Sequence, residues 1–441
     1  MSASEQSNSQ VQRSGWFSAD GGDSRPLRLG YEAWLDGSAV VGRLARELPP
    51  HAADLIEIAA MTYAADRLSR RKADRDTVDG SGWGRRFRLQ IPVRRPDLWA
   101  AAAAELTEFL AWLTHDDWAL MFCQLYPGAG SLDHSQGFLF DMVPDGSPAA
   151  LFSGGLDSAL GLARDLELDP VAVSVYTNPR MRATQRSVFS GICGGRGRCM
   201  HLQYRVSLHQ ADCENSQRTR GLLFLAAGIG TVWGLGQDRL RVYENGIGAI
   251  NLPYLRSQHG PQATRSVHPH TLWLAERLAS KVSGRPFRID TPFMLSTKAE
   301  AVRSVPQIST ATIADTVSCD AGFAARVPGA RQCGTCTSCL LRRQALFAAG
   351  RFDADAATAY RTRNPAGSDE LTAMTWQLDR LASALADRVP WHGLVSKFPP
   401  VLDTSPLAPA EVVRLYRAYV WEWEAVGPEF GLRRHDGAAA S

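Results

Sequence analysis

Hydrophobic and polar residues follow two different periods in the N-terminal part of this chain. Apolar residues recur at helical spacing from Ala52 to Leu68 and again from Pro96 to Phe122, which predicts two helical segments. Between them, Arg86 to Val93 alternates as a strand with one buried face does. We expect residues 26–146 to form an N-terminal domain of mixed α and β structure, preceded by a mobile polar tail over residues 1–25.

From residue 147 to residue 350 the pattern alternates between short apolar strands and amphipathic helices. Strands are predicted at Ala149–Phe152, Val171–Tyr176, Met200–Leu208, Arg239–Tyr243 and Phe287–Ile289, and helices at Asp157–Leu166, Arg218–Trp233 and His270–Leu278. This βαβ rhythm predicts an α/β fold, a parallel sheet with helices on both faces. Ligands of such sheets bind at the carboxyl ends of the strands. Residues 351–441 predict a C-terminal helical extension.

Composition and charge exclude some classes of protein. Hydrophobic residues make up 45% and charged residues 21% of the chain, which excludes disorder as the main state. The net charge of +3 is small for a general nucleic-acid coat protein. Basic residues gather between Arg67 and Arg95, and we interpret them as a solvated face or, as the second choice, a docking surface for nucleic acid or another acidic partner. Without an export signal or a long apolar segment, we expect a cytoplasmic protein.

A glycine-rich turn follows the first strand of the α/β segment and opens a helix. Its residues are Ser153, Gly154, Gly155, Leu156, Asp157 and Ser158. Glycine lets the backbone approach an anion without a clash from Cβ, and a helix start offers free N–H groups and the positive end of its dipole. With two serine hydroxyl groups, these features predict a phosphate-binding loop. The alternative is an ordinary turn in which Ser153 caps the helix and the dipole favours Asp157.

Cysteines cluster near the end of the α/β segment. The residues Cys319, Cys333, Cys336 and Cys339 have the spacing C-x13-C-x2-C-x2-C. Such thiolates suit the tetrahedral preference of Zn²⁺, so we predict a closed structural zinc site, with an iron–sulfur cluster as the alternative. A looser group consists of Cys193, Cys199, Cys213 and His201. Its spacing is irregular, and we interpret it as ordinary cysteines and only secondarily as a second metal site.

The glycine-rich loop is the signature of the PP-loop ATP pyrophosphatases, which this chain therefore resembles. Together with the cysteines, it makes residues 147–350 similar to the 7-cyano-7-deazaguanine synthase family, QueC. Other segments that resemble this family's pattern are Thr291–Glu300, Thr316–Cys319 and Cys333–Arg342. The resemblance implies a PP-loop (adenine nucleotide alpha hydrolase-like) fold, ATP bound by the loop and Arg220, Mg²⁺ near Asp157, and cleavage of ATP to AMP and pyrophosphate.

Family chemistry begins when the carboxylate of 7-carboxy-7-deazaguanine attacks the α-phosphorus of ATP. An amine then displaces AMP and forms an amide; in the ordinary enzyme the amine is ammonia, and a second ATP dehydrates the amide to a nitrile. The resemblance implies catalytic roles for Asp157, Ser158 and Lys298. The alternative for Lys298 is a solvated helix lysine, and Glu300 forms a capping box with Thr297, which favours a structural role for Glu300.

The chain departs from the family on the acceptor side. The D-Y-G-Q-R-H segment is missing, and Tyr176–Arg180 stands in its place. The substrate loop of the family is replaced by Tyr243–Tyr254, in which Glu244, Asn245 and Asn251 are candidates to bind a guanine-like edge. Gly221 stands where the family carries Asn after its Arg.

Longer proteins of this build resemble the QatC-type components of antiphage defence operons. That resemblance implies an amide between the deazaguanine acid and an amine of a partner protein, with the flanking regions 26–146 and 351–441 binding the partner. The alternatives are an ordinary synthase that uses ammonia, a zinc- and ATP-binding module without catalysis, and a tRNA thiolase of the same superfamily.

Overall fold

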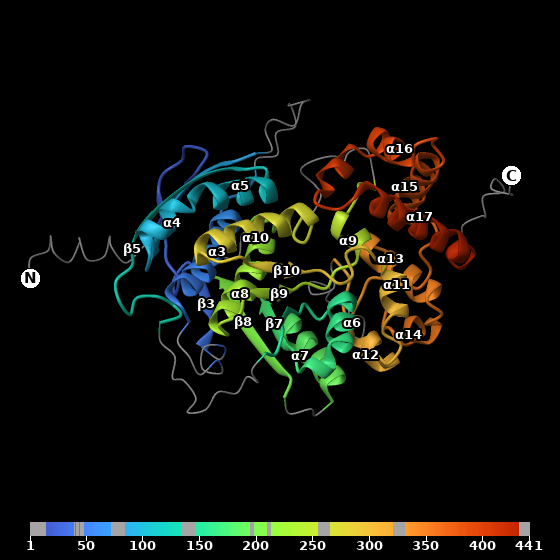
Figure 1. Ribbon diagram of the computed structural model, residues 1–441, viewed down its shortest axis with the longest axis horizontal. Helices are drawn as coiled ribbons and strands as arrows, with labels where there is room; N and C mark the ends of the chain where they lie inside the picture. Colours follow the sequence, from blue (N-terminus) through green and yellow to red (C-terminus); the bar gives the residue numbers. More distant parts are fainter. Residues whose placement is uncertain are drawn as a thin grey trace, which may run out of the picture.

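The centre of the molecule is a six-stranded sheet in the order β10-β9-β6-β7-β8-β3 (Figure 1). The structure is a computed structural model that describes residues 15–38, 40, 44, 48–71, 84–133, 146–194, 198–209, 213–254, 265–320 and 331–431. The strands are β3 (Ala33–Asp36), β6 (Ala149–Leu151), β7 (Val171–Tyr176), β8 (Met200–Leu208), β9 (Arg239–Arg241) and β10 (Arg288–Asp290). The strands from β6 to β10 are parallel, which confirms the predicted sheet.

The direction in which the sheet grows reverses beside β6. From β6 the chain adds β7 and β8 on one side, and it then returns to add β9 and β10 on the other side. Such a reversal leaves a crevice at the carboxyl ends of the two central strands, where ligands of open α/β sheets bind. In this chain the crevice lies between the end of β6, which leads into the glycine-rich loop, and the end of β9.

Helices cover both faces of the central sheet. They are α6 (Leu156–Arg164), α7 (Pro179–Cys193), α8 (Arg220–Gly234) and α10 (Pro269–Ser283). Along β7, Val171 and Val173 belong to the core shared with α8 and α10, whereas Ala172 belongs to the core shared with α6 and α7. Because successive strand residues point to opposite faces, this division places the two helix pairs on opposite sides of the sheet. Figure 1 shows α6 and α7 on one side and α8 and α10 on the other.

The helix α7 was not expected from the sequence. Its segment is polar overall, and only Met181, Gln185, Val188 and Cys193 are buried. The local signals are nevertheless present, because Asn178 accepts a hydrogen bond from the N–H of Met181 at 2.9 Å and Pro179 occupies the first turn. Because the polar Gln185 lies on the buried face, the apolar residues of this helix do not recur at a clear helical spacing.

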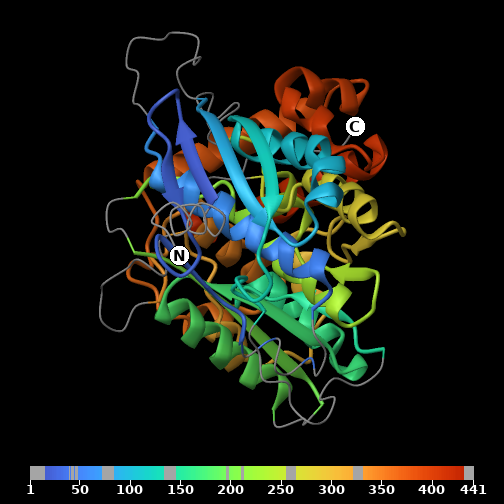
Figure 2. The same cartoon turned by 90° about the vertical axis from the view of Figure 1, so that its left-hand side faces the viewer.

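The N-terminal residues build a second sheet in the order β2-β1-β4-β5, seen from its side of the molecule in Figure 2. Its strands are β1 (Gly15–Ala19), β2 (Arg25–Leu27), β4 (Arg86–Val93) and β5 (Asp117–Gln124). The helix α3 (Pro50–Leu68) is buried from Ala52 to Asp66, and its Ile56 shares one hydrophobic core with Phe87 of β4 and Leu225 of α8. The domain boundary at residue 146 stays a prediction, although this core crosses it.

Two N-terminal expectations were wrong in their bounds. Residues 15–19 were expected in a mobile tail, but they form β1, which pairs with both β2 and β4. The helical segment expected through Phe122 ends earlier, after α4 (Pro96–Ala101) and α5 (Ala103–Thr114). His115 adopts a left-handed φ of 56°, which ends the helix and lets the chain return as β5 beside β4. The spacing of the apolar residues after His115 is compatible with a helix and with a strand. Pairing with β4 favours the strand.

In the basic segment between Arg67 and Arg95, Arg71, Arg85 and Arg94 form neither a solvated face nor a docking surface, whereas Arg86 has 85% of its side chain exposed. Arg85 is buried and pairs with Asp66 and, at 2.7 Å, with Asp116. Arg71 pairs with Asp116 at 2.9 Å with only 4% of its side chain exposed. Arg94 pairs with Asp54 and Glu57, at 2.9 Å in each case. Guanidinium groups satisfied in this way hold α3 against the sheet and are not available to nucleic acid.

The C-terminal residues form a helical layer, as predicted. Its helices are α14 (Phe352–Ala357), α15 (Asp369–Leu385), α16 (Pro390–Lys397) and α17 (Pro409–Val426), with 3-10 turns η3 (Pro399–Thr404) and η4 (Gly427–Phe430). Between them and the sheet lie α9 (Gly246–Ile250), α11 (Lys298–Arg303), α12 (Thr310–Asp315) and α13 (Thr337–Ala348), while η1 (Leu166–Leu168) follows α6. A second hydrophobic core joins Ile247 of α9, Leu340 of α13 and Leu415 of α17. Among the described helices, none combines the length and apolar character needed to cross a membrane.

Candidate functional site

A cavity of about 440 Å³ lies at the carboxyl ends of β6 and β9. Its walls come from segments far apart in the chain: the glycine-rich loop, the start of α8, the segment after β9, the start of α11 and the segment around Cys319. Members of each predicted group line it, namely Ser153, Gly155, Leu156, Asp157, Ser158, Arg220, Glu244, Asn251, Lys298 and Cys319. The fold therefore brings most of the predicted site residues to one place, where the sheet topology favours ligand binding.

The glycine-rich loop presents its backbone to this cavity. Gly155 is the N-cap of α6 and no side chain caps the helix, so the alternative in which Ser153 caps the helix is wrong. Instead, the Ser153 hydroxyl accepts a hydrogen bond from the N–H of Gly155 at 3.1 Å and lies 3.1 Å from the Ser158 hydroxyl. The first N–H groups of α6 have no acceptor within the helix. Together with two hydroxyl groups, they form a cradle suited to an oxyanion.

Gly154 is the position in this loop that only glycine satisfies. Its φ is +79°, and a Cβ there would lie 3.3 Å from the backbone of Gln185 in α7. The Gly154 carbonyl accepts a hydrogen bond from the N–H of Val317 at 3.1 Å. The loop is therefore held from both sides, by α7 and by the segment that leads to Cys319.

A charged cluster stands beside the loop. Lys298 forms an ion pair with Asp157, and the side chains of both are at least nine-tenths buried. The Asn245 amide donates to Asp157 Oδ1 at 3.2 Å and to Glu244 Oε1 at 3.1 Å. Burial, together with the nearby Asp157 carboxylate, raises the pKa of Glu244 to about 8. The alternative of a solvated Lys298 is thereby wrong, and the cluster puts a buried ammonium next to the anion cradle.

The three residues that are candidates to bind a guanine-like edge occupy different positions. Glu244 and Asn251 line the cavity, and Asn251 ends α9 with a left-handed φ of 48°. Asn245 is fully buried behind the wall, where its carbonyl oxygen accepts from the N–H of Gly248 at 3.0 Å and caps α9. Because both ends of this amide are engaged, Asn245 holds Asp157 and Glu244 in place and does not face the cavity.

Arg220 begins α8 and also lines the cavity. Its guanidinium donates to Gln217 Oε1 at 3.3 Å and lies 5.6 Å from the Phe224 ring centroid. Burial lowers the pKa of Arg220, although the nearby charge of Asp320 opposes this shift. An anionic ligand in the cavity would compensate for the lost hydration of the guanidinium. The departure at Gly221 has a steric reason, because a Cβ there would lie 2.9 Å from Ser266 Cα.

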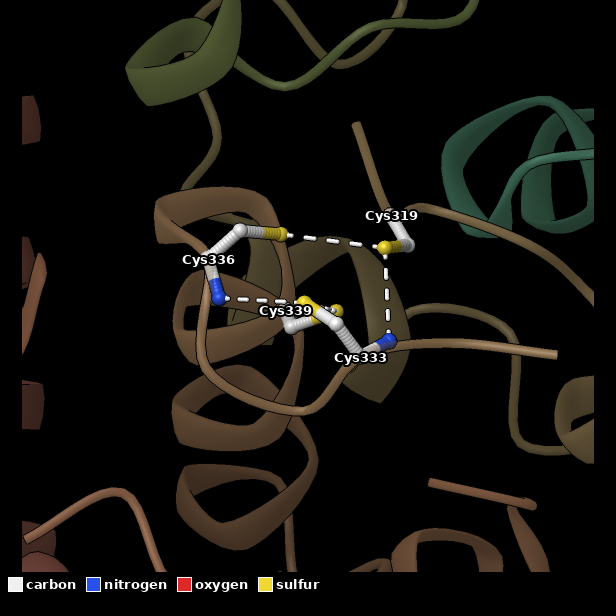
Figure 3. Close-up of side chains that lie close together, drawn as sticks. All are labelled: Cys319, Cys333, Cys336 and Cys339. Atoms are coloured by element: carbon white, nitrogen blue, oxygen red, sulfur yellow. Dashed lines mark hydrogen bonds between the residues drawn. The ribbon is translucent and has the colours of Figure 1, made fainter. Parts of the chain in front are cut away.

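The four clustered cysteines converge on one point (Figure 3). Their sulfur atoms all lie within 4.8 Å of one another, with 3.8 Å between Cys333 and Cys339 and 3.9 Å between Cys336 and Cys319. A tetrahedron with Zn–S bonds of ~2.3 Å has edges of about 3.8 Å. The arrangement therefore fits a single Zn²⁺ and leaves no room for an iron–sulfur cluster.

Backbone groups orient the cysteine ligands. The N–H of Cys333 donates to the sulfur of Cys319, and the N–H of Cys336 donates to the sulfur of Cys333, each at 3.3 Å (Figure 3). Gly334 has a φ of +90°, and a Cβ there would lie 1.9 Å from the carbonyl oxygen of Thr362. Such contacts to ligand sulfur atoms are typical of metal sites and favour the thiolate form.

Cys319 of the cysteine cluster lines the cavity, and other side chains hold the segment that contains it. Arg342, fully buried in α13, donates to Thr316 Oγ1 at 2.5 Å and to the carbonyl of Ile313 at 2.6 Å. Gln332 accepts from the N–H of Ser318 at 3.1 Å and donates to the carbonyl of Thr316. The segment Thr316–Asp320 is thus fixed by the cluster at one end and by Arg342 and Gln332 along its length.

The cavity also contains residues that the sequence pattern did not single out. Asp320, Ser338, Tyr254 and Ser266 line it, and the Ser338 hydroxyl donates to Asp320 Oδ1 at 2.8 Å. The signal for two of them was their position, because Asp320 follows Cys319 directly and Ser338 lies between the last two cysteines. Tyr254 ends the segment Tyr243–Tyr254, which replaces the substrate loop of the family, whereas Ser266 carried no comparable signal.

The looser cysteine group does not form a metal site. In the part of the chain that the structure describes, no other set of His, Cys, Asp or Glu ligands than the four clustered cysteines converges. His201 Nε2 lies 2.8 Å from the Ser174 hydroxyl, and its ring stacks on Phe189 with 4.8 Å between centroids. These contacts make His201 a packed residue of the sheet face.

Comparison with protein families identifies one match. Residues 268–350 match the family described as "Queuosine biosynthesis protein QueC". No curated protein matches the chain. The matched segment contains Lys298 and the four clustered cysteines but begins after the glycine-rich loop. Residues 268–350 are therefore QueC-like, as their motifs predict, and this segment contributes Lys298 and Cys319 to the cavity wall.

Proposed function

We propose that this protein uses ATP to adenylate the carboxylate of 7-carboxy-7-deazaguanine and then joins the acid through an amide to an amine of a partner protein. A carboxylate oxygen attacks the α-phosphorus, and pyrophosphate leaves. The amine nitrogen then attacks the carbonyl carbon of the acyl-adenylate, AMP leaves with the bonding electrons, and the amine loses a proton. Similarity to the QueC family supports ATP-dependent adenylation, which makes the protein an enzyme of the C–N ligase type.

The observation that carries this proposal is the meeting of two independent signals in one cavity. The anion cradle at the start of α6 forms one wall, and the QueC-like segment with Lys298 forms another. Neither signal alone identifies the reaction, because many enzymes that bind nucleotides contain a phosphate-binding loop. A cradle for phosphate that faces a buried ammonium is suited to stabilising charge on a phosphoryl group during transfer.

Each residue of the cluster has a role in this scheme. The N–H groups at the start of α6, with Ser153 and Ser158, bind the outer phosphates of ATP. Lys298 stabilises negative charge at the α-phosphate, and Arg220, which also lines the cavity, binds the nucleotide. Asp157 offers the carboxylate oxygen that Mg²⁺ prefers, and the ion would share this group with Lys298. Zn²⁺ supplies no chemistry of its own in a closed Cys₄ site and acts structurally.

The acceptor side of the cavity is where the protein departs from ordinary synthases. Glu244 and Asn251 face this space from the segment after β9, and Asp320 and Ser338 face it from the cysteine cluster. Carboxyl and amide groups match the donors and acceptors of a guanine-like ring. The altered segments and the added terminal regions suggest that the amine comes from a protein, as the resemblance to QatC-type defence proteins implies.

The experiment is to incubate the protein with ATP, 7-carboxy-7-deazaguanine and the protein encoded beside it, and to weigh that partner by intact mass spectrometry. An added mass equal to the acid minus water supports conjugation. An unchanged partner together with free 7-cyano-7-deazaguanine would instead identify an ordinary synthase that uses ammonia. Absence of any acid-dependent pyrophosphate release would identify a binding module without catalysis.

A further inference from the structure

The C-terminal helix α17 (Pro409–Val426) contacts the segment that carries Lys298. Figure 1 shows α17 beside α9, α11 and α13, on the side of the molecule away from the N-terminal sheet. One face of α17 packs in the second hydrophobic core through Tyr416 and Tyr419. Polar groups of the same helix reach α11, which begins at Lys298.

Glu422 of α17 holds the residue that precedes Lys298. Its Oε1 accepts a hydrogen bond from the Thr297 hydroxyl at 2.8 Å and pairs with Arg303 Nη2 at 2.6 Å. Thr297 is the N-cap of α11, and its hydroxyl oxygen also accepts from the N–H of Glu300 at 3.0 Å. One hydroxyl group thus links the buried carboxylate of α17 to the first turn of the lysine-bearing helix.

Arg414 of α17 binds Glu300, the second member of the capping box of α11. Its guanidinium pairs with Glu300 Oε1 at 2.6 Å and also donates to the carbonyl of Leu295. The remaining oxygen of Glu300 accepts from the N–H of Thr297 at 2.8 Å, which closes the capping box. Both members of the box, Thr297 and Glu300, are therefore bound from outside by α17.

The contacts of Glu422 are poorly explained by a contribution to folding stability alone. Glu422 is 1% exposed, and its Oε2 has no hydrogen-bond partner among the described residues. Burial raises the pKa of Glu422, because a charged carboxylate loses its hydration there. A carboxylate with one oxygen unsatisfied costs folding energy that an apolar side chain would not. Such a group is more easily understood if it orients a neighbour.

We propose that α17 is a positioning element of the active site and that Glu422, acting through Thr297, sets the place of the Lys298 ammonium beside Asp157. α11 has only six residues, and a helix that short is marginal without help from its surroundings. A shift at its first turn moves Lys298 directly. The C-terminal extension then completes the site in addition to any role in binding a partner. This inference rests on the proposed function of Lys298.

The test is a double-mutant cycle in the full chain between Glu422→Leu and Lys298→Met, read as kcat and KM for acid-dependent pyrophosphate release. Glu422→Leu keeps the side-chain volume but removes the acceptor, and we expect kcat to fall at least about tenfold. In the Lys298→Met background the same change should cost little more, because the residue it positions is already gone. Glu424→Leu, an exposed position on the same helix, is the matched control.

A second pair of variants distinguishes an effect on the position of Lys298 from a loss of folding. Thr297→Ser keeps the hydroxyl group, and Thr297→Val replaces it with a methyl group of the same size. We expect Ser to retain kcat and Val to lose it, with both chains folded by circular dichroism. Additive losses in the cycle, or equal rates for Ser and Val, would overturn the positioning role.

The proposed function can fail separately from this inference. If the unaltered protein releases no pyrophosphate with the acid, the proposed function is wrong. The same cycle is then read on the dissociation constant for ATP, measured by calorimetry without turnover. Non-additive effects of Glu422→Leu and Lys298→Met on that constant support the coupling, and additive effects, or no effect, refute it.

Discussion

The N–H of Val317 donates a hydrogen bond to the carbonyl of Gly154 at 3.1 Å. This single contact joins the glycine-rich loop to the segment that leads to Cys319. The cysteine cluster therefore does more than close a surface loop, because it fixes one side of the anion cradle. The geometry of the cradle should depend on whether a metal ion holds the four sulfur atoms together.

Loss of the metal should damage both stability and catalysis. We expect Cys336→Ser to lose bound zinc, to lower the midpoint of thermal unfolding by about 10 °C or more, and to reduce pyrophosphate release. Zinc content by mass spectrometry and unfolding by calorimetry are the measurements. Cys123→Ser is the control, because Cys123 lies in β5, far from the cluster in the fold. A zinc-free variant as stable and active as the parent would contradict the prediction.

Gly154→Ala should fold but lose most of its activity. The φ of +79° and the contact at 3.3 Å with the Gln185 backbone oppose any side chain there, at a cost of about 1–2 kcal/mol in the free energy of unfolding. The strain falls on the cradle itself, so pyrophosphate release should drop by more than tenfold.

Gly194→Ala provides the matched control for that substitution. Gly194 ends α7 with a φ of +48°, and nothing lies within 4 Å of a Cβ placed there. It should lose about 1 kcal/mol of stability but keep its activity. Equal activity losses in the two variants would show that the effect of Gly154 is not local to the loop.

Removing the Lys298 ammonium should lower both the reaction rate and the stability of the fold. Lys298→Met leaves the buried Asp157 with Asn245 and without its cation. We expect acid-dependent pyrophosphate release to fall about 10²- to 10³-fold and the free energy of unfolding to fall by a few kcal/mol. Lys281→Met, on the exposed end of α10, should change neither quantity. A rate within twofold of the parent would exclude a catalytic role for Lys298.

Stability should fall in acid because of His268. Burial, with a further contribution from Arg265, lowers the pKa of this residue to about 3, and its Nδ1 accepts from the N–H of His270 at 3.2 Å. Between about pH 6.5 and about pH 3, the unfolded chain therefore binds a proton that the folded chain does not. The free energy of unfolding decreases as the pH falls through this window.

His268→Asn should keep the cap of α10 but remove this titration, because asparagine offers an acceptor that does not bind protons. The measurement is urea unfolding at several pH values. In the variant the slope between pH 6.5 and pH 3 should be smaller than in the parent. An unchanged slope would assign the acid sensitivity to other groups.

Much of this architecture could be predicted from local pattern. The strands β4, β7 and β8 have the expected bounds, because each is an apolar or alternating run that ends at a clear turn. The cysteine cluster and the glycine-rich loop were predictable for the same reason, since most of their groups come from one short stretch. Predictions failed where the pattern was ambiguous, as after His115, or where polar residues were buried, as in α7 and at Arg85.

What the sequence alone determined is the chemistry that neighbouring residues can build together: the anion cradle after β6, the metal ligands and the βαβ order of the sheet. The folded structure, in contrast, determines which distant groups meet. Lys298 pairs with Asp157 across 141 positions, and Glu422 reaches Thr297 across 125. A periodic pattern in the sequence does not reveal such pairs, because the spacing between their members depends on all the helices and strands that lie between them in the chain.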